Sequence, residues 1–236
     1  MFIIGHGTIY IWNNSINIDT GSKCTLKCPA CMRQKPELHD LTGAHLTLDI
    51  VRNLVESGQF TRFTFCGQIS DPMVHPNMVP ILEYCRHKVE VEMIVAASHK
   101  PERYWRECFA ANPEAKYIFG IDGLPHKSHL YRINQDGEKL FDMMLIAAYE
   151  FKMEPTWMHI IFKYNEDEID QCRELAKQHN IKFTVVKSGR FYPETAAVDK
   201  AQELRIIDYN NKYLPSNPDN FVGARFNVKT KMHRNN

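Results

Sequence analysis

The chain has 236 residues, of which 44% are hydrophobic and 24% charged, an ordinary globular composition with enough apolar side chains for a core. Its 29 basic and 28 acidic residues leave a formal net charge of +1, which argues against broad attraction to nucleic acid or an anionic membrane. No apolar run approaches the roughly 20 residues of a membrane-spanning helix. The N-terminus lacks the features of a signal peptide and the seven cysteines are an odd number, so we expect reduced thiols, a cytoplasmic location and no membrane partner.

Strands and helices are predicted to alternate along most of the chain. Short apolar segments predict strands, and apolar residues at helical spacing predict the helices between them. The expected strands cover 16–20, 62–67, 89–97, 115–123, 156–165 and 181–189. The expected helices cover 47–58, 78–87, 101–110, 137–152 and 166–180.

This alternation predicts an α/β fold whose parallel strands are joined by right-handed crossovers. Six units fall short of a closed eight-stranded barrel, so the pattern leaves open a partial barrel or an open doubly wound sheet. In both, the functional site lies at the carboxyl ends of the strands. We expect one domain over residues 1–190, with a short N-terminal strand extension, followed by an irregular tail or arm over 191–236.

Three cysteines lie close together in the segment "GSKCTLKCPAC", at Cys24, Cys28 and Cys31. Their spacing would suit one face of a helix, but Pro29 disfavours a helix there, so we expect a loop after the first strand. Three thiols in such a loop suit a soft metal. Zinc would need a fourth ligand, for which His39 stands at an unusual spacing. An iron–sulfur cube held by three thiolates would leave its fourth iron open.

A C-x3-C-x2-C loop after the first strand of a six-unit α/β chain resembles the radical S-adenosylmethionine (SAM) superfamily. The resemblance implies a partial (β/α)6 barrel and a [4Fe–4S] cluster on Cys24, Cys28 and Cys31. In that family the open iron binds the amino and carboxylate groups of SAM. One electron then cleaves SAM to methionine and a 5′-deoxyadenosyl radical, which takes a hydrogen atom from the substrate.

Two further segments strengthen the resemblance. "FTFCGQISDPMVHPN" is similar to the family's G-G-E-P segment, which implies SAM contacts at Gly67, Gln68, Ser70 and Asp71, with the Asp71 carboxylate at the ammonium group. "FGIDGLPHKSHLYRIN" is similar to the family's S-I-D-G segment with a downstream Arg. It implies contacts at Gly120, Asp122 and Arg132, with the Arg132 guanidinium reaching the SAM carboxylate.

Weaker matches and departures concern the rest of the SAM site. Asn165 in "FKYNEDEI" matches a family turn, although it also suits a helix N-cap. Ser98 stands in "VAASHK", where the family usually has T-N-G. Ala30 replaces a residue that usually touches the adenine, and Gly120 replaces the Ser of S-I-D-G. These departures leave the adenine and ribose contacts unassigned.

The resemblance implies a minimal radical SAM enzyme, closest to the peptide- and sulfatase-modifying branch. No cysteine follows Cys172, so the cysteine-rich SPASM or twitch domain and its auxiliary cluster are not expected. The expected partners are a peptide or small-molecule substrate and a one-electron donor such as flavodoxin or ferredoxin, and nucleic acid ranks lower. The alternative is a non-catalytic binding module stabilised by zinc.

No catalytic residue is assigned, but candidates for the substrate side follow from the expected strand ends. They are Trp157, His159, Lys163, Lys187 and Arg190, each of which also suits packing or a solvated rim. The tail is expected to cover the open flank of the partial barrel. Its aromatic candidates for packing are Tyr192, Phe221 and Phe226, and its basic candidates for an anionic substrate group are Arg225, Lys229 and Lys231.

Overall fold

The computed structural model describes residues 2–4, 7–12, 14–29, 31, 33, 45–67, 69–162 and 164–186. One sheet runs through this part of the chain, with its strands in chain order. The strands are β1 (Phe2–Ile4), β2 (Gly7–Trp12), β3 (Ser15–Ile18), β4 (Arg62–Phe65), β5 (Glu90–Val95), β6 (Lys116–Gly120), β7 (Thr156–Ile160) and β8 (Lys182–Val186). The α-helices are α1 (Leu48–Glu56), α2 (Met78–Cys85), α3 (Glu102–Ala111), α4 (Gly137–Tyr149) and α5 (Ile169–Gln178). Short 3-10 helices are η3 (Pro72–Val74), η4 (Pro125–Leu130) and η5 (Glu166–Glu168).

The six strands from β3 to β8 are parallel, each hydrogen-bonded to the next along the chain. This open sheet with its crossover helices confirms the predicted partial (β/α)6 barrel. The predicted N-terminal extension consists of β1 and β2, which pair antiparallel with each other, and β2 pairs antiparallel with β3. Among the described residues, no helix is both long and apolar enough to cross a membrane.

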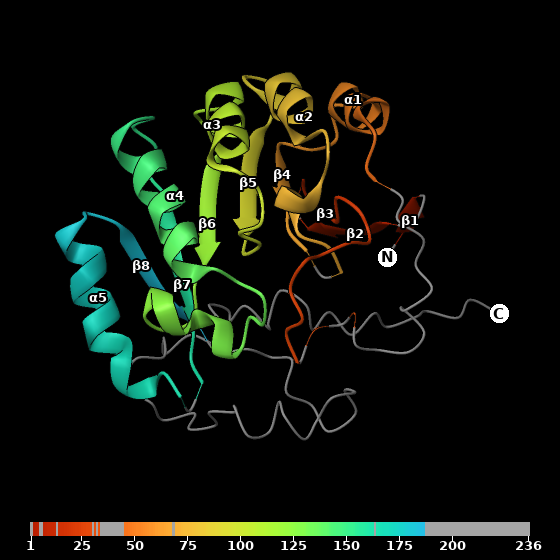
Figure 1. Ribbon diagram of the computed structural model, residues 1–236. Coiled ribbons are helices and arrows are strands. Elements are labelled where there is room, and N and C mark those ends of the chain that lie inside the picture. The colour runs from red at the N-terminus through yellow and green to blue at the C-terminus, as the bar shows by residue number, and fades with distance from the viewer. Residues whose placement is uncertain are drawn as a thin grey trace.

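The helices line the outer side of the sheet one after another, as Figure 1 shows from α1 to α5. An apolar core fills the space between these helices and the strands. Its largest members are aromatic, and the indole of Trp105 on α3 stacks on Phe119 of β6 with the ring centroids 5.9 Å apart. Side-chain caps fix helix starts locally, as where Asp136 accepts a hydrogen bond from the Lys139 N–H at the start of α4.

Five strands end earlier than the sequence pattern predicts: β3, β4 and β5 by two residues each, β6 by three and β7 by five. β6 ends at Gly120 and β7 ends at Ile160, so the expected strand ends over 121–123 and 161–165 are wrong. The cause is polar side chains that take the backbone N–H groups near these ends. The Asp122 carboxylate accepts a hydrogen bond from the Ile160 N–H, and the Asn165 amide oxygen accepts one from the Phe162 N–H. These bonds convert the last predicted strand residues into turns at the carboxyl edge.

Several predicted features lie outside the described residues. They are the tail over 191–236 with its candidates Tyr192, Phe221, Arg225, Phe226, Lys229 and Lys231, the substrate-side candidates Lys163, Lys187 and Arg190, and also Gln68, Ala30 and His39. The predictions for these residues stay predictions, as does the domain boundary at residue 190.

Candidate cofactor site

The cysteine loop, which we define as residues 22–29, crosses the carboxyl edge of the sheet and is bonded on two sides. On one side, the Lys23 carbonyl accepts a hydrogen bond of 3.3 Å from the Asp71 N–H, in the segment after β4. On the other, the Lys27 N–H donates a bond of 3.0 Å to the Ile133 carbonyl, in the segment after η4. The chain therefore brings the loop of Cys24 and Cys28 between the two segments that resemble SAM-binding motifs.

Two polar side chains hold the backbone of the cysteine loop. Nη1 of Arg33 donates to the carbonyls of Cys24 at 3.0 Å and Leu26 at 3.3 Å. Nδ2 of Asn134 donates to the Thr25 carbonyl at 3.2 Å. Three successive carbonyls of the loop thus accept hydrogen bonds from side chains, which define the shape of the loop.

The thiols of Cys24, Cys28 and Cys31 are half-buried. Burial, with a further contribution from the Asp71 carboxylate, raises the pKa of Cys24 to about 12. A cation is therefore needed to hold this side chain as a thiolate ligand. Among the described residues, no three His, Cys, Asp or Glu side chains are grouped to hold a metal ion. Zinc–sulfur bonds of about 2.3 Å require thiolates roughly 4 Å apart, whereas the three thiolates of a cube bind separate irons and lie farther apart.

The segment after β4 is a tight turn ordered by two buried carboxylates. A side chain at Gly67 would collide with the Ser70 carbonyl oxygen, 1.2 Å from the position of a Cβ, so only glycine fits. Oδ1 of Asp19, just beyond β3, accepts hydrogen bonds from the N–H groups of Ile69 and Ser70 and from the Ser70 hydroxyl, at 3.1–3.2 Å. The N–H and the hydroxyl of Ser70 are therefore both used to hold this turn.

Asp71 is buried and receives three backbone donors. Its Oδ1 accepts from the Met73 N–H at 2.9 Å, and its Oδ2 accepts from the N–H groups of Ala96 at 2.8 Å and Ala97 at 2.9 Å. Burial raises the pKa of Asp71, while the three N–H donors and the charge of Arg132 oppose this rise. A carboxylate accepts about four hydrogen bonds, so about one lone pair is left for a further donor. Asp71 thereby joins the turn after β4 to the end of β5.

Asp122 and Arg132 form a buried ion pair beyond β6. Nε of Arg132 lies 2.7 Å from Oδ2 of Asp122, whose side chain is 0% exposed, while that of Arg132 is 11% exposed. Burial opposes the charge of Arg132, but the Asp122 carboxylate raises the pKa of Arg132 overall. A Cβ at Gly120 would lie 2.7 Å from one Nη of Arg132. Glycine in place of serine at this position therefore makes room for the guanidinium.

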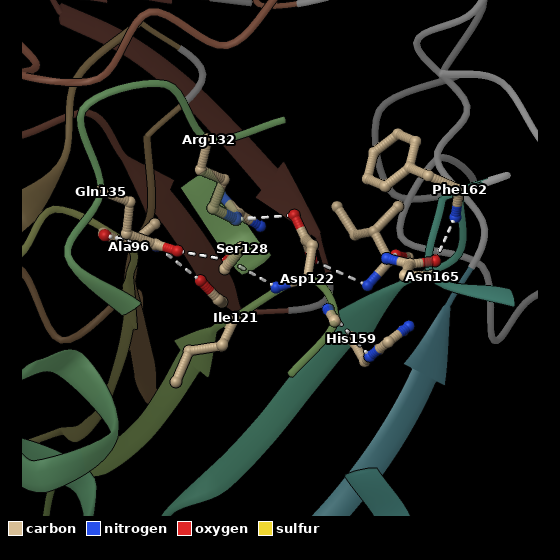
Figure 2. A network of polar contacts seen from close by, with 12 residues as sticks. Ala96, Ile121, Asp122, Ser128, Arg132, Gln135, His159, Phe162 and Asn165 are labelled. Carbon is tan, nitrogen blue, oxygen red and sulfur yellow. Dashed lines mark hydrogen bonds and ion pairs between the residues drawn. The ribbon is translucent and has the colours of Figure 1, made fainter. Parts of the chain in front are cut away.

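The rest of the segment after β6 is held by a polar network that Figure 2 shows around Ser128 and Gln135. The Ser128 hydroxyl accepts a hydrogen bond of 2.8 Å from the Asp122 N–H and donates one to Oε1 of Gln135. Nε2 of Gln135 donates to the carbonyls of Ala96 at 2.7 Å and Gly120 at 2.9 Å. The predicted contact residue Ser98 accepts from the Asp136 N–H at 2.8 Å. These bonds link the ends of β5 and β6 to the start of α4.

The end of β7 supports the turn at Asp122. Nδ1 of His159 accepts a bond of 3.2 Å from the Gly123 N–H, and the Tyr164 hydroxyl donates one of 2.5 Å to the Asp122 carbonyl. His159 is fully buried, and burial lowers its pKa. Asn165 stands at the N-cap position of η5, as the N-cap interpretation has it, but its side chain makes no capping bond there. Its Nδ2 instead donates to the Ile160 carbonyl at 3.0 Å and closes the turn.

Among the described candidates for the substrate side, Trp157 lies in the core of the protein. Trp157 is fully buried in the helix-side core, and its indole N–H donates to the Ile121 carbonyl at 2.8 Å. Of the two interpretations offered for Trp157, packing is therefore confirmed and the substrate side is not. His159 points to the same face of β7 and supports a turn. Sequence reasoning also missed Asp19, Arg33, Ser128, Asn134 and Gln135. Only Asp19 carried a signal, because like Asp122 it directly follows an apolar strand.

Comparisons with known proteins were made for both sequence and structure. A scan against protein-family models found no match, and a search of curated proteins also found none. Among solved structures, SuiB of Streptococcus suis bound to the precursor peptide SuiA superposes with a TM-score of 0.62 at 12% identity, over 76% of this chain and 40% of SuiB. The matched part of the chain therefore shares the fold of the matched part of SuiB.

Other structures share this SuiB-like fold. SuiB bound to S-adenosylmethionine gives a TM-score of 0.60 at 13% identity, over 75% of this chain and 41% of that chain. Native anSMEcpe with bound AdoMet and the Kp18Cys peptide gives 0.55 at 14% identity, over 73% of this chain and 51% of that chain. The chain thus spans two fifths to one half of the length of these proteins.

Proposed function

We propose that this protein is a radical SAM enzyme that holds a [4Fe–4S] cluster on Cys24, Cys28 and Cys31. The observation that carries the proposal is the arrangement of the cysteine loop, which is hydrogen-bonded to Asp71 on one side and to Ile133, the residue after Arg132, on the other. When bound, the cluster supplies one electron for the reductive cleavage of SAM, and the resulting 5′-deoxyadenosyl radical takes a hydrogen atom from the substrate. The SuiB-like fold supports the proposal, since SuiB and anSMEcpe both bind SAM.

The donor set fits such a cluster. Three half-buried thiols on a preformed loop suit a soft, positively charged group. Cys24 lies close enough to Asp71, and Cys28 to Arg132, for their charges to influence one another. A ligand bound beside the three thiolates would therefore meet one acidic and one basic side chain.

Arg132 suits the carboxylate of SAM. Its Nε is paired with Asp122, while its two Nη groups donate to no other described residue. A planar guanidinium fixed at one nitrogen can present the remaining donors to a carboxylate in a defined orientation. Asp122 then acts as a positioning residue that keeps the guanidinium in place.

The ammonium of SAM is proposed to bind the turn at Gly67, Gln68, Ser70 and Asp71. Asp71 has room for about one more donor, and its other lone pairs already order the turn. The Asp71 carboxylate therefore contributes one hydrogen bond and the shape of the turn. Ser98, Gly120 and Asn165 line the neighbouring strand ends, where Ser98 and Asn165 bond to the backbone.

A peptide is the favoured substrate class, with a small molecule as the other possibility. SuiB was solved with a precursor peptide and anSMEcpe with the Kp18Cys peptide, and both share this fold. A one-electron donor such as flavodoxin or ferredoxin and a cytoplasmic location are part of the same proposal.

The test is anaerobic reconstitution with iron and sulfide, followed by incubation with SAM and a reductant. We expect a brown protein with about four irons, from the stoichiometry of a cube, and release of 5′-deoxyadenosine detected by mass spectrometry. The variant with Cys24, Cys28 and Cys31 all changed to Ala should lose iron and activity. Cys172→Ala, which alters a buried cysteine on α5, is the control and should keep both. A colourless protein that binds zinc and never cleaves SAM would overturn the proposal in favour of the zinc-stabilised module.

A further inference from the structure

The segment Tyr131–Gln135 contacts the cysteine loop and the β6 end at the same time. Arg132 pairs with Asp122 through Nε. The next two residues bond to the cysteine loop, through the Ile133 carbonyl to the Lys27 N–H and through Nδ2 of Asn134 to the Thr25 carbonyl. Gln135 then anchors the segment to the ends of β5 and β6. Within five residues, one stretch of chain therefore sets the distance between the cysteines and the Arg132 guanidinium.

Asn134 has a backbone conformation that few residues adopt readily. Its φ is +73°, in the left-handed region where Asn and Asp are tolerated better than other non-glycine residues. This backbone turns the chain so that the carbonyl before Asn134 and its own side-chain amide both face the cysteine loop. Asn supplies the left-handed backbone and the donor together, which glycine, aspartate and alanine do not.

We propose that Asn134 is a positioning residue that fixes the spacing between the cysteine loop and Arg132. Its importance for catalysis rests on the proposed function. A ligand that binds both a cluster on the cysteines and the Arg132 guanidinium must span the distance between them. A loop that drifts by about 1 Å would weaken one of the two contacts. The structural part of the proposal does not depend on the proposed cluster, since the bond joins two segments of the chain itself.

Hydrogen exchange of the metal-free protein, read by mass spectrometry on the peptide that covers residues 23–29, tests the structural part. Asn134→Asp keeps a residue that tolerates the left-handed backbone but removes the donor, and Asn134→Gly keeps only the backbone. Both should speed exchange in this peptide by about 2- to 10-fold, the factor that corresponds to one lost hydrogen bond. Asn134→Ala should speed exchange in this peptide at least as much, because it loses the donor and strains the backbone.

Asn180 provides the matched control. It also has a positive φ, +54°, but lies after α5 and bonds to the helix end. Asn180→Ala imposes comparable backbone strain and should leave exchange of residues 23–29 unchanged. Wild-type exchange in Asn134→Asp and Asn134→Gly would overturn the proposal. Faster exchange across the whole chain in those two variants would overturn it as well, since it would indicate general unfolding.

A second readout separates positioning from catalysis. In cluster-loaded Asn134→Asp with wild-type iron content, we expect the KM for SAM to rise about 2- to 10-fold with a smaller change in kcat. An unchanged KM in this variant would contradict the assigned spacing role. If the wild type itself cleaves no SAM, the proposed function fails, while the exchange experiment still decides whether Asn134 holds the loop.

Discussion

The helix-covered face of the sheet and its carboxyl edge are stabilised in different ways. The face is an apolar core in which Trp105, Tyr117 and Phe119 pack ring against ring. The edge is built from buried carboxylates, and Asp71 and Asp122 each accept backbone N–H groups from a neighbouring segment. Apolar burial is non-directional and shared among many side chains, whereas each bond at the edge depends on one side chain in one orientation. Substitutions in the core should therefore change stability alone, and substitutions at the edge should also change the geometry of the site.

Trp105→Ala should give the largest effect on stability. The side chain is fully buried and stacks on Phe119, so its loss should lower the free energy of unfolding by about 3–5 kcal/mol. Denaturant unfolding measures the change. Trp105→Phe should cost less, since the indole N–H has no hydrogen-bond partner among the described residues. Iron bound per folded molecule should stay at the wild-type value, and a fall would show that the core and the edge are not independent.

Arg132→Met comes next and acts at the edge. It leaves the fully buried Asp122 carboxylate without its cation, which should cost about 3 kcal/mol, the low end for breaking a buried pair because the guanidinium is partly exposed. Adding Asp122→Asn should recover much of the loss, since no buried charge then remains. A double-mutant cycle by denaturant unfolding measures the coupling, and purely additive effects would contradict it.

His75 should make stability depend on pH below neutrality. Its Nε2 donates to the Leu46 carbonyl and its Nδ1 accepts from the Asn77 N–H, so a second proton on the ring would break the latter bond. Burial, with smaller contributions from His45 and Lys100, lowers the pKa of His75 from 6.5 to about 4. As pH falls from 6.5 towards 4, the unfolded chain gains a proton that the folded chain resists. The free energy of unfolding should fall by up to about 3 kcal/mol.

The measurement for His75 is denaturant unfolding between pH 7 and pH 4. His75→Gln, which does not titrate, should show a shallower decline over this range than the wild type. Parallel curves for the two proteins would mean that other groups cause the acid sensitivity.

Asp71→Asn should act on SAM binding and should also weaken the turn after β4, because an amide nitrogen cannot accept the backbone N–H groups that one carboxylate oxygen accepts. The amide loses the charge that the proposed site offers to the ammonium group, so SAM should bind roughly 1.5–3 kcal/mol more weakly. Titration of cluster-loaded protein with SAM measures the change. Asp49→Asn, which alters an exposed carboxylate on α1, is the control. Equal affinities in both variants would show that the SAM site has been assigned to the wrong carboxylate.

The order of strands and helices could be predicted from the sequence because apolar spacing is a local property. The α1 and α4 helices and all six parallel strands are found where the pattern indicates them. The ends of the strands were harder to predict. Asp122 and Asn165 end β6 and β7 through hydrogen bonds to residues that the sequence alone does not place beside them.

The candidate site was partly predictable for the same reason. Cys24, Asp71 and Arg132 stand in short motifs, and the fold brings the segments that carry them together. Arg33 lies outside the quoted motifs and Asn134 ends one of them without an assigned role, and the bonds of both to the cysteine loop depend on tertiary contacts. For Trp157 the sequence left packing and the substrate side open, and its place near the start of β7 puts it in the core.

The chain-ordered sheet has a consequence for biosynthesis. Each strand from β3 to β8 pairs with the strand that was synthesised just before it, so the sheet can grow from one edge as the chain leaves the ribosome. The cysteine loop is made early, yet its bonds to Ile133 and Asn134 need a segment made about a hundred residues later. Metal delivered to the nascent chain would meet thiols that are not yet held in place. Loading of the proposed cluster should therefore follow translation of β6 and the segment beyond it.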